Sequence, residues 1–352
     1  MLHELQISVD SQMLVFNKDS VQANRISPTN PRALFFNDTT VVGWVRGGFI
    51  ELASEDPKEG VVFYSLDNRA TATGSIVRRD NCVSCHDSYG SVGVPGMLDK
   101  SFLQFSVTHR VPMDKRWGGW YVTGQAEGHH LGNIVDLQHA FATPPPAGTL
   151  NRPSLEDTFD TTGYLAPQSD IVALLVFDHQ MHMMNLLTRI GWEARVLDFR
   201  KGTTAEQLRR AGDDPSDQPI SLNAAANEVV DYMLFVDEAP LSRPIHGATD
   251  FAREFMAVGP RDHRGRSLRE LDLHTRLLTY PCSYLIYSKQ FDDLPLSAKT
   301  AIYRRMWQVL SGQDHDPAYA RLTRDTRATI IDILRDTKAD LPSYFRPLRR
   351  TL

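Results

Sequence analysis

The stretch Ser169-Asp-Ile-Val-Ala-Leu-Leu-Val-Phe-Asp-His-Gln-Met-His-Met-Met-Asn-Leu-Leu187 decides the fold class, because it predicts one long helix. Ser169 and Asp170 are residue types that cap helix N-termini, and about thirty residues with helical periodicity follow them. Two apolar faces run along this helix, so we expect it to be buried on most sides. One face holds Ile171, Leu175, His179, His182 and Leu186, and the other holds Val172, Val176, Met183 and Leu187.

The chain after this helix has the pattern of a helical region. Further helices are expected at 221–237, 248–257, 267–279, 283–291, 298–311 and 324–337. Ser297 and Thr323 are the expected N-caps of the last two, and Gly312 stands where a helix-ending glycine belongs.

The chain before the long helix favours strands. Runs rich in β-branched and aromatic residues, separated by turn signals, predict strands at 33–36, 41–45, 50–52 and 61–64. Residues 102–124 are also expected to be extended, and residues 144–160 are the best linker candidate. The prediction is an α+β, mostly α fold. A small strand-rich region, 1–150, carries a helical region, 160–352, packed on it, either as two units or as one integrated domain.

Composition excludes two classes of partner. Apolar residues make up 41% and charged residues 23% of the 352, with a formal charge of −5. This gives no basic field, so nucleic acid is not an expected partner. The longest apolar run of the predicted helix, 171–177, is far too short to cross a bilayer, so no integral membrane segment is expected.

The run Asn81-Cys-Val-Ser-Cys-His-Asp87 carries the clearest chemistry. Two thiols three positions apart can form thioethers with the two vinyl groups of one haem, and the adjacent imidazole then lies under the iron. The pattern is typical of haem c attachment, with Cys82 and Cys85 as the thioethers and His86 as the proximal axial ligand. A zinc site would need a second pair of ligands, and a thioredoxin-like pair would need a βαβ unit. The third cysteine, Cys282, is expected to be a small buried apolar residue.

The second axial ligand is less well defined by the sequence. His179 and His182 lie on one face of the long helix at i, i+3 spacing, while His109, His130 and Met97 lie nearer to the motif. The candidates retained are His179, His130, His109 and Met97. Arg116, Trp117 and Trp120 could form a haem pocket, with Arg116 pairing to a propionate. The alternative for this run is a tightly packed turn between strands.

Several runs together resemble a family of uncharacterised bacterial cytochrome c domain-containing proteins with a single Cys-x-x-Cys-His motif. The most specific are Trp117-Gly-Gly-Trp120 and Ser283-Tyr-Leu-Ile-Tyr287. Others are 11–16, 26–28, 31–38, 82–86, 93–96, 116–124, 130–133, 169–174, 179–180, 185–189, 280–287 and 336–338. The resemblance covers nearly the whole chain. It implies a haem-binding, exported protein whose relatives begin earlier with an export signal, and it implies no particular reaction.

Two functions follow as expectations. The first is a c-type cytochrome with one covalent haem that transfers electrons outside the cytoplasm, in the periplasm or otherwise exported, to a redox partner protein. The alternative is a haem redox enzyme, peroxidase-like or a small-molecule oxidoreductase, with an open distal iron position. His109-Arg110 is a dipeptide that would suit peroxide cleavage. Residues 1–25 have no export signal, so we expect Met1 to be an internal position of a longer protein.

Overall fold

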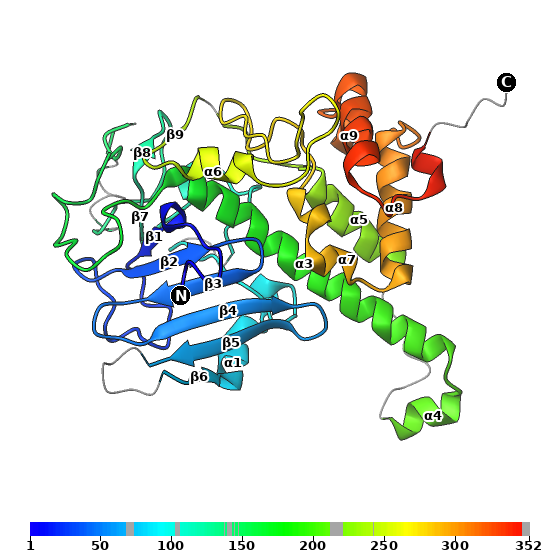
Figure 1. The fold of residues 1–352 in the computed structure, drawn as a ribbon, viewed down its shortest axis with the longest axis horizontal. Helices are drawn as coiled ribbons and strands as arrows, with labels where there is room; N and C mark the ends of the chain where they lie inside the picture. Colours follow the sequence, from blue (N-terminus) through cyan, green and yellow to red (C-terminus); the bar gives the residue numbers. More distant parts are fainter. Residues whose placement is uncertain are drawn as a thin grey trace.

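A long helix, α3 (Ile171–Lys201), crosses the molecule in the computed structural model (Figure 1). The model describes residues 1–67, 74–102, 106–136, 138, 143, 145–146, 148–211, 221–241 and 243–346. A β-sheet lies on one side of α3, and helices α5, α7 and α8 pack along the other (Figure 1). The fold class is therefore α+β, as predicted.

The sheet is antiparallel and has seven strands in the order β6-β5-β4-β3-β2-β1-β7. Its strands are β1 (Met13–Val15), β2 (Arg32–Phe36), β3 (Thr40–Trp44), β4 (Ile50–Asp56), β5 (Gly60–Leu66), β6 (Ile76–Arg78) and β7 (Trp120–Tyr121). A two-stranded ribbon pairs β8 (Gly124–Gln125) with β9 (His246–Gly247). The four predicted strands are confirmed as β2 to β5. The sheet is larger than these four strands, because β7 joins it from the segment expected to be extended and β1 and β6 join it from segments for which no strand was predicted.

The two faces of the sheet bury different cores. Alternate residues such as Leu34 and Phe36 face α3 and join a cluster that extends from Met13 to Phe345. The strand-rich and helical regions thus share one core. The opposite face, with Phe35 among its residues, is covered in part by Leu155. The later part of the predicted linker at 144–160 therefore packs against the sheet instead of running free between two regions.

The long helix forms because its N-terminus is strongly capped and nearly all its first half is apolar. The Asp170 carboxylate accepts hydrogen bonds from the amides of Val172 (2.7 Å) and Ala173 (3.2 Å), as an N-cap should. The same side chain also accepts from the amides of Ala248 and Thr249, which ties the helix start to β9. The prediction of a long, mostly buried helix is confirmed.

Apart from α4, which the sequence did not predict, and the helix expected at 267–279, the remaining helices follow the predicted order. The helices after α3 are α4 (Ala205–Arg210), α5 (Leu222–Met233), α6 (Phe251–Ala257), α7 (Lys289–Asp292), α8 (Leu296–Leu310) and α9 (Arg324–Thr337). Thr323 caps α9, and Gly312 has a left-handed backbone just after α8, both as predicted. Pro295, not Ser297, is the N-cap of α8. Within the described residues no helix is both long enough and apolar enough to traverse a bilayer.

Two predicted elements are wrong. Residues 267–279 form turns and not a helix, because the Asp272 carboxylate accepts from the amides of His274 and Thr275 and Leu273 is left-handed (φ 58°). The segment predicted as extended, 102–124, contains only β7 and the start of β8, apart from residues 103–105, which lie outside the described part. A left-handed Trp117 (φ 64°) turns the chain just before β7.

Candidate haem attachment site

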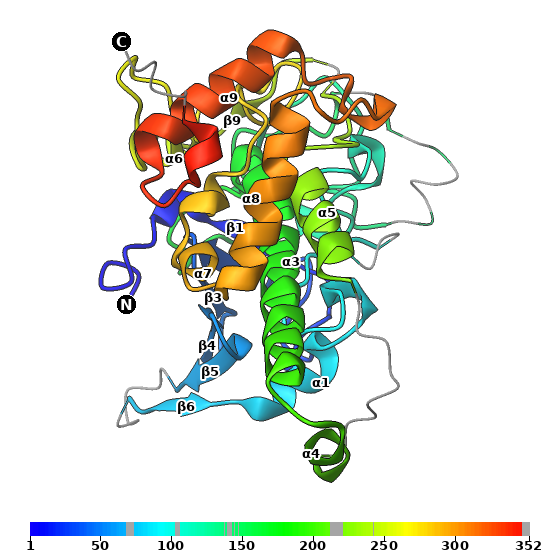
Figure 2. The ribbon, with the colours of Figure 1, turned by 90° about the vertical axis from the view of Figure 1, so that its right-hand side faces the viewer.

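The Cys-Val-Ser-Cys-His motif occupies two short turns of helix directly after β6. A 3₁₀ turn, η2 (Asp80–Cys82), leads into α1 (Val83–His86), so both cysteines and the histidine lie within about two turns of chain. Cys82 is half-buried and Cys85 is exposed, and neither forms a disulfide. Figures 1 and 2 place α1 and β6 at the end of the molecule opposite to α9. The Cys85 thiol is thus open to solvent, and the Cys82 thiol is partly so.

The His86 ring is held through one nitrogen only. Its Nδ1 lies 2.8 Å from the Gly96 carbonyl oxygen, and the ring packs on Phe63 with 4.4 Å between centroids. A hydrogen bond from Nδ1–H to a backbone carbonyl fixes the tautomer in which Nε2 carries the lone pair. Burial lowers the pKa of His86, which favours the neutral ring that binds a metal. This arrangement is the one that an iron ligand requires.

The loop after the motif is anchored on α3. Asn185 receives the Met97 amide on its Oδ1 (2.9 Å) and donates its Nδ2 to the Met97 carbonyl (2.8 Å). Gly96 donates its amide to the His86 carbonyl, and the Ser91 hydroxyl donates to the same oxygen at 2.6 Å. A Cβ on Gly96 would lie 2.3 Å from the Asn185 Oδ1, so this close approach requires glycine. The position of His86 is therefore set by the core helix.

Three cationic side chains lie near the motif, and the sequence analysis did not single them out. Arg32 and Lys100 both act electrostatically on His86, and Arg79 acts on Cys82. Arg32 pairs with Glu51 at 2.6 Å across Gly43, and Arg79 donates to the Ser65 hydroxyl at 2.7 Å. They come from β2, from the end of β6 and from the loop near residue 100. The folded sheet and this loop together bring the three cationic side chains near the motif.

The chemistry of these residues fits a haem c. Two free thiols and a neutral imidazole with an available Nε2 match the covalent and proximal contacts of such a group. Positive charge for the two propionates could come from Arg79, whereas Arg32 is already paired with Glu51 and Lys100 lies 3.9 Å from Asp19. A bound haem would supply an iron centre that exchanges one electron or binds a small ligand.

Arg116 and Trp117 are placed elsewhere, in the core beside α3. The Arg116 guanidinium pairs with Asp178 at 3.0 Å, and both side chains are almost fully buried. It also donates to the carbonyls of His109 and Val111, while the Trp117 indole donates to Asp178 at 3.2 Å. Arg116 is therefore already neutralised inside the protein. The alternative interpretation of this run, a tightly packed turn, is the one that the structure shows.

A second buried carboxyl lies against this ion pair. Asp99 is 1% exposed, and burial together with the nearby Asp178 carboxylate raises its pKa well above the usual range. Its oxygen atoms have no hydrogen-bond donor from the described residues. A protonated Asp99 carries no charge. The Arg116 charge therefore has to balance the charge of Asp178 and not that of Asp99.

His109 and His179 are paired with each other in the core. Their Nδ1 atoms are 2.8 Å apart, and the His179 Nε2 lies 2.8 Å from the Ser283 hydroxyl. Both rings stack with Tyr232 and Phe235. Burial lowers the pKa of His179 to about 3 and that of His109 well below its ordinary value, so both are neutral. Both ring nitrogens of His179 are engaged, which leaves none for iron.

The other two candidates for the second axial position are also buried. Met97 is held by Asn185 through its amide and carbonyl, and its side chain belongs to the shared core. His130 packs edge-on against Trp117 at 5.7 Å, and burial lowers its pKa to about 4. The four candidates are thus spread over three places in the core. Trp120 is buried too, with its indole donating to the Lys100 carbonyl at 2.7 Å.

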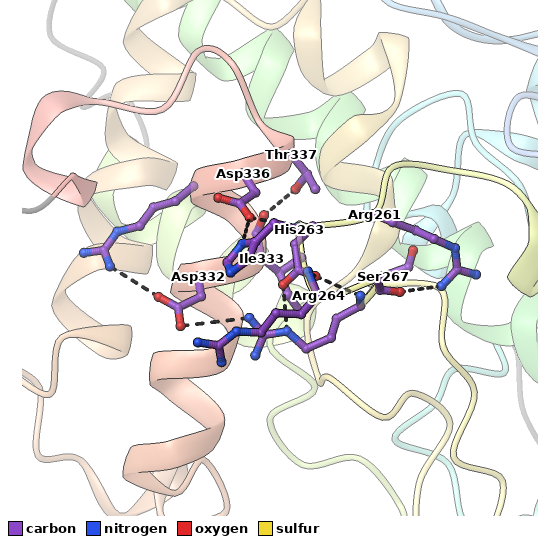
Figure 3. A network of polar contacts seen from close by, with 12 residues as sticks. Arg261, His263, Arg264, Ser267, Asp332, Ile333, Asp336 and Thr337 are labelled. Atoms are coloured by element: carbon purple, nitrogen blue, oxygen red, sulfur yellow. Dashed lines mark hydrogen bonds and ion pairs between the residues drawn. The ribbon is translucent and has the colours of Figure 1, made fainter.

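One further group has the residue types of a metal site. Asp262, His263 and Asp336 place ligand atoms within 4.8 Å of one another where a loop meets α9 (Figure 3). The Asp262 carboxylate already accepts from the amides of Arg264 and Arg266 and from the Arg266 side chain. His263 bonds Asp336 through its ring and its backbone amide. These contacts make the group a clamp between loop and helix, so we assign it no metal.

Comparison with models of known protein families, with curated proteins and with solved structures finds no match to this chain. Its site is therefore interpreted from its own residues.

Proposed function

We propose that this protein is a c-type cytochrome that carries one haem through Cys82 and Cys85, with His86 as the proximal ligand. The observation that carries the proposal is the His86 ring. Its Nδ1 is bound to the Gly96 carbonyl, and the ring stands in the same helical turn as a free thiol. A purely structural role for His86 would not explain why two unpaired cysteines lie beside it at this spacing. Since haem c is normally attached outside the cytoplasm, the proposal includes an exported, periplasmic location and a redox partner protein.

Electron transfer is the first function proposed for this haem. The proximal loop is tied to α3 through Asn185, so the ligand changes position little when the iron changes charge. Cys85 is exposed, which would leave one edge of the haem near the surface for a partner protein. Both features suit an electron carrier.

A second candidate function is supported by the distal side. Both ring nitrogens of His179, one of the candidates for the second axial ligand, are hydrogen-bonded in the core, so this side chain is not free to bind an iron in this structure. An open or exchangeable position is the requirement for a haem redox enzyme, such as a peroxidase-like enzyme. This observation keeps the catalytic alternative beside electron transfer.

Absorption spectroscopy separates the two functions. The full chain would be exported in a bacterium that expresses haem-maturation machinery, and ferric and ferrous spectra recorded with and without carbon monoxide or cyanide. A low-spin spectrum that neither ligand changes supports the electron carrier and refutes the open iron site. A high-spin spectrum that shifts on adding either ligand supports the enzyme.

Substitutions then identify the second axial ligand. His130→Ala and His179→Ala are compared with His263→Ala, a matched surface histidine. If low-spin haem is lost only in His130→Ala, then His130 is the ligand. Loss only in His179→Ala would mean that the His109–His179 pair opens when haem binds.

A further inference from the structure

A pocket lies beyond the C-terminal end of α5, away from the haem motif. Two adjoining cavities of about 540 Å³ and 280 Å³ share Asp237, Glu238 and Arg321 in their walls. Figure 2 shows α5 ending toward α9, while α1 lies at the opposite end of the molecule. The volumes are in the range of small-molecule sites.

Three arginines line this pocket. Arg110 lines the larger cavity, Arg276 the smaller one and Arg321 both; Arg110 and Arg276 are half-buried and Arg321 is exposed. None of them forms a close ion pair with a carboxylate of the described residues, although Arg276 and Arg321 act electrostatically on Glu238. Guanidinium groups without a close carboxylate have donors to offer to a ligand.

The hydrogen bonds of these arginines hold them in position and leave donors unused. Among the described residues, Arg110 donates its Nε alone, to the Val236 carbonyl (3.0 Å), and its guanidinium lies over the Tyr232 ring. Within the same residues, Arg321 donates one Nη, to the Glu238 carbonyl (2.7 Å). Planar guanidinium groups fixed in this way bind carboxylate and phosphate groups in bidentate fashion.

The acidic groups of the pocket do not cancel this charge. The Glu238 carboxylate accepts the Leu277 amide (2.8 Å) and is 8% exposed, and burial raises its pKa to about 7, so it is partly neutral. Asp237 is exposed. Three guanidinium charges therefore face at most one full and one partial negative charge.

The wall that holds these groups is rigid and strained. Phe235 (φ 57°) and Asp237 (φ 62°) both have left-handed backbones, which costs free energy in residues other than glycine. The segment is held to the neighbouring chain by hydrogen bonds from Ala239 to the His109 carbonyl and from Leu241 to the Thr275 carbonyl. Strain of this kind is maintained where it fixes a site.

We propose that this pocket binds a small oxyanion, carried by a carboxylate or a phosphate group, through Arg110, Arg276 and Arg321. The site is independent of the haem, because none of its residues belongs to the motif or its surroundings.

Calorimetric titration of the full chain tests the proposal, with inorganic phosphate and succinate as separate probes. We expect saturable binding of at least one probe with a Kd below about 1 mM. Binding of phosphate alone assigns a phosphate-bearing ligand, and binding of succinate alone assigns a carboxylate. The double variant R276Q/R321Q should weaken binding at least tenfold, since it removes two charge-assisted contacts to the probe.

The control has the same change in net charge outside the pocket. R304Q/R324Q replaces two exposed arginines that line neither cavity and should leave the Kd unchanged. If the pocket variant does not fold, R276Q alone replaces a side chain without a hydrogen bond and should weaken binding several-fold. The proposal is overturned if neither probe saturates at 10 mM, or if both double variants weaken binding equally.

Discussion

Replacing Arg116 with methionine should lower the free energy of unfolding by more than any substitution at the surface. The variant would leave Asp178 buried without its charge partner and the part-buried Val111 carbonyl without its donor, while the His109 carbonyl keeps the Ala239 amide. Breaking a buried ion pair from one side costs about 3–5 kcal/mol. The cost of the lost carbonyl contact is partly contained in that figure, so we expect the free energy of unfolding to fall by about 4 kcal/mol in total. That is a large share of the roughly 5–15 kcal/mol that stabilises a typical domain.

Urea denaturation followed by circular dichroism measures this loss. The control is Arg253→Met, because Arg253 and Asp250 form an exposed pair whose loss should leave the stability nearly unchanged. The double variant Arg116→Met/Asp178→Asn should lose less stability than the two single variants lose together, and the difference should exceed about 1 kcal/mol. A loss below about 1 kcal/mol for Arg116→Met would refute the reasoning. If that variant keeps its stability and changes the haem spectrum, Arg116 is a propionate partner instead.

Three further perturbations test other parts of the structure. Glu238→Gln keeps the acceptor for the Leu277 amide but removes a carboxyl whose pKa burial raises from 4.5 to about 7. Ionising that carboxyl costs the folded state stability as pH rises from 4.5 through 7, so at pH 8 the variant should be more stable than wild type by about 3 kcal/mol, and equal to it at pH 4. Equal stabilities at both pH values in urea titrations would contradict this. Asp170→Ala removes the N-cap of α3 and the acceptor for two amides near β9, and thermal unfolding should show a loss of about 3 kcal/mol; a loss under 0.5 kcal/mol would show that the cap is dispensable. Gly124→Ala would place a Cβ 2.5 Å from the His246 carbonyl at φ +123°, so it should lower the midpoint of thermal unfolding by several degrees, whereas Gly265→Ala, with open space around it, should lower it less.

The parts of the fold that the sequence predicts well are those with strong local signals. The long helix is apolar on nearly every side and has a cap residue before it, so both periodicity and boundary point to the same structure. Strands β2 to β5 are runs of β-branched and aromatic residues between turns. In contrast, the segment 267–279 has helical spacing but carries Asp272, whose carboxylate binds nearby amides and stops the helix. A local hydrogen bond of this kind competes with periodicity and is not visible in the pattern.

The candidate site likewise contains residues that the sequence alone identifies and residues that it does not. The spacing of Cys82, Cys85 and His86 is local, so the sequence alone identifies the three residues. The Gly96 carbonyl that holds His86 lies only 10 positions on, in the loop after the motif, but no sequence pattern reveals this contact, and Arg32 reaches the site from β2 through the folded sheet. Arg116 seemed free to bind a propionate because nothing in its neighbourhood of sequence reveals Asp178, 62 positions away. Long-range pairs of this kind cannot be read from one sequence.

The most direct test of the proposed cytochrome is the mass of the chain after export in cells that attach haem c. We predict that the intact protein gains the mass of one haem and stays haem-positive on a denaturing gel. Cys82→Ala/Cys85→Ala should lose the haem, and Cys282→Ala, which removes the third, buried cysteine, should keep it. An unmodified mass for the wild-type chain, under conditions in which a known c-type cytochrome is matured in the same cells, would contradict the central claim.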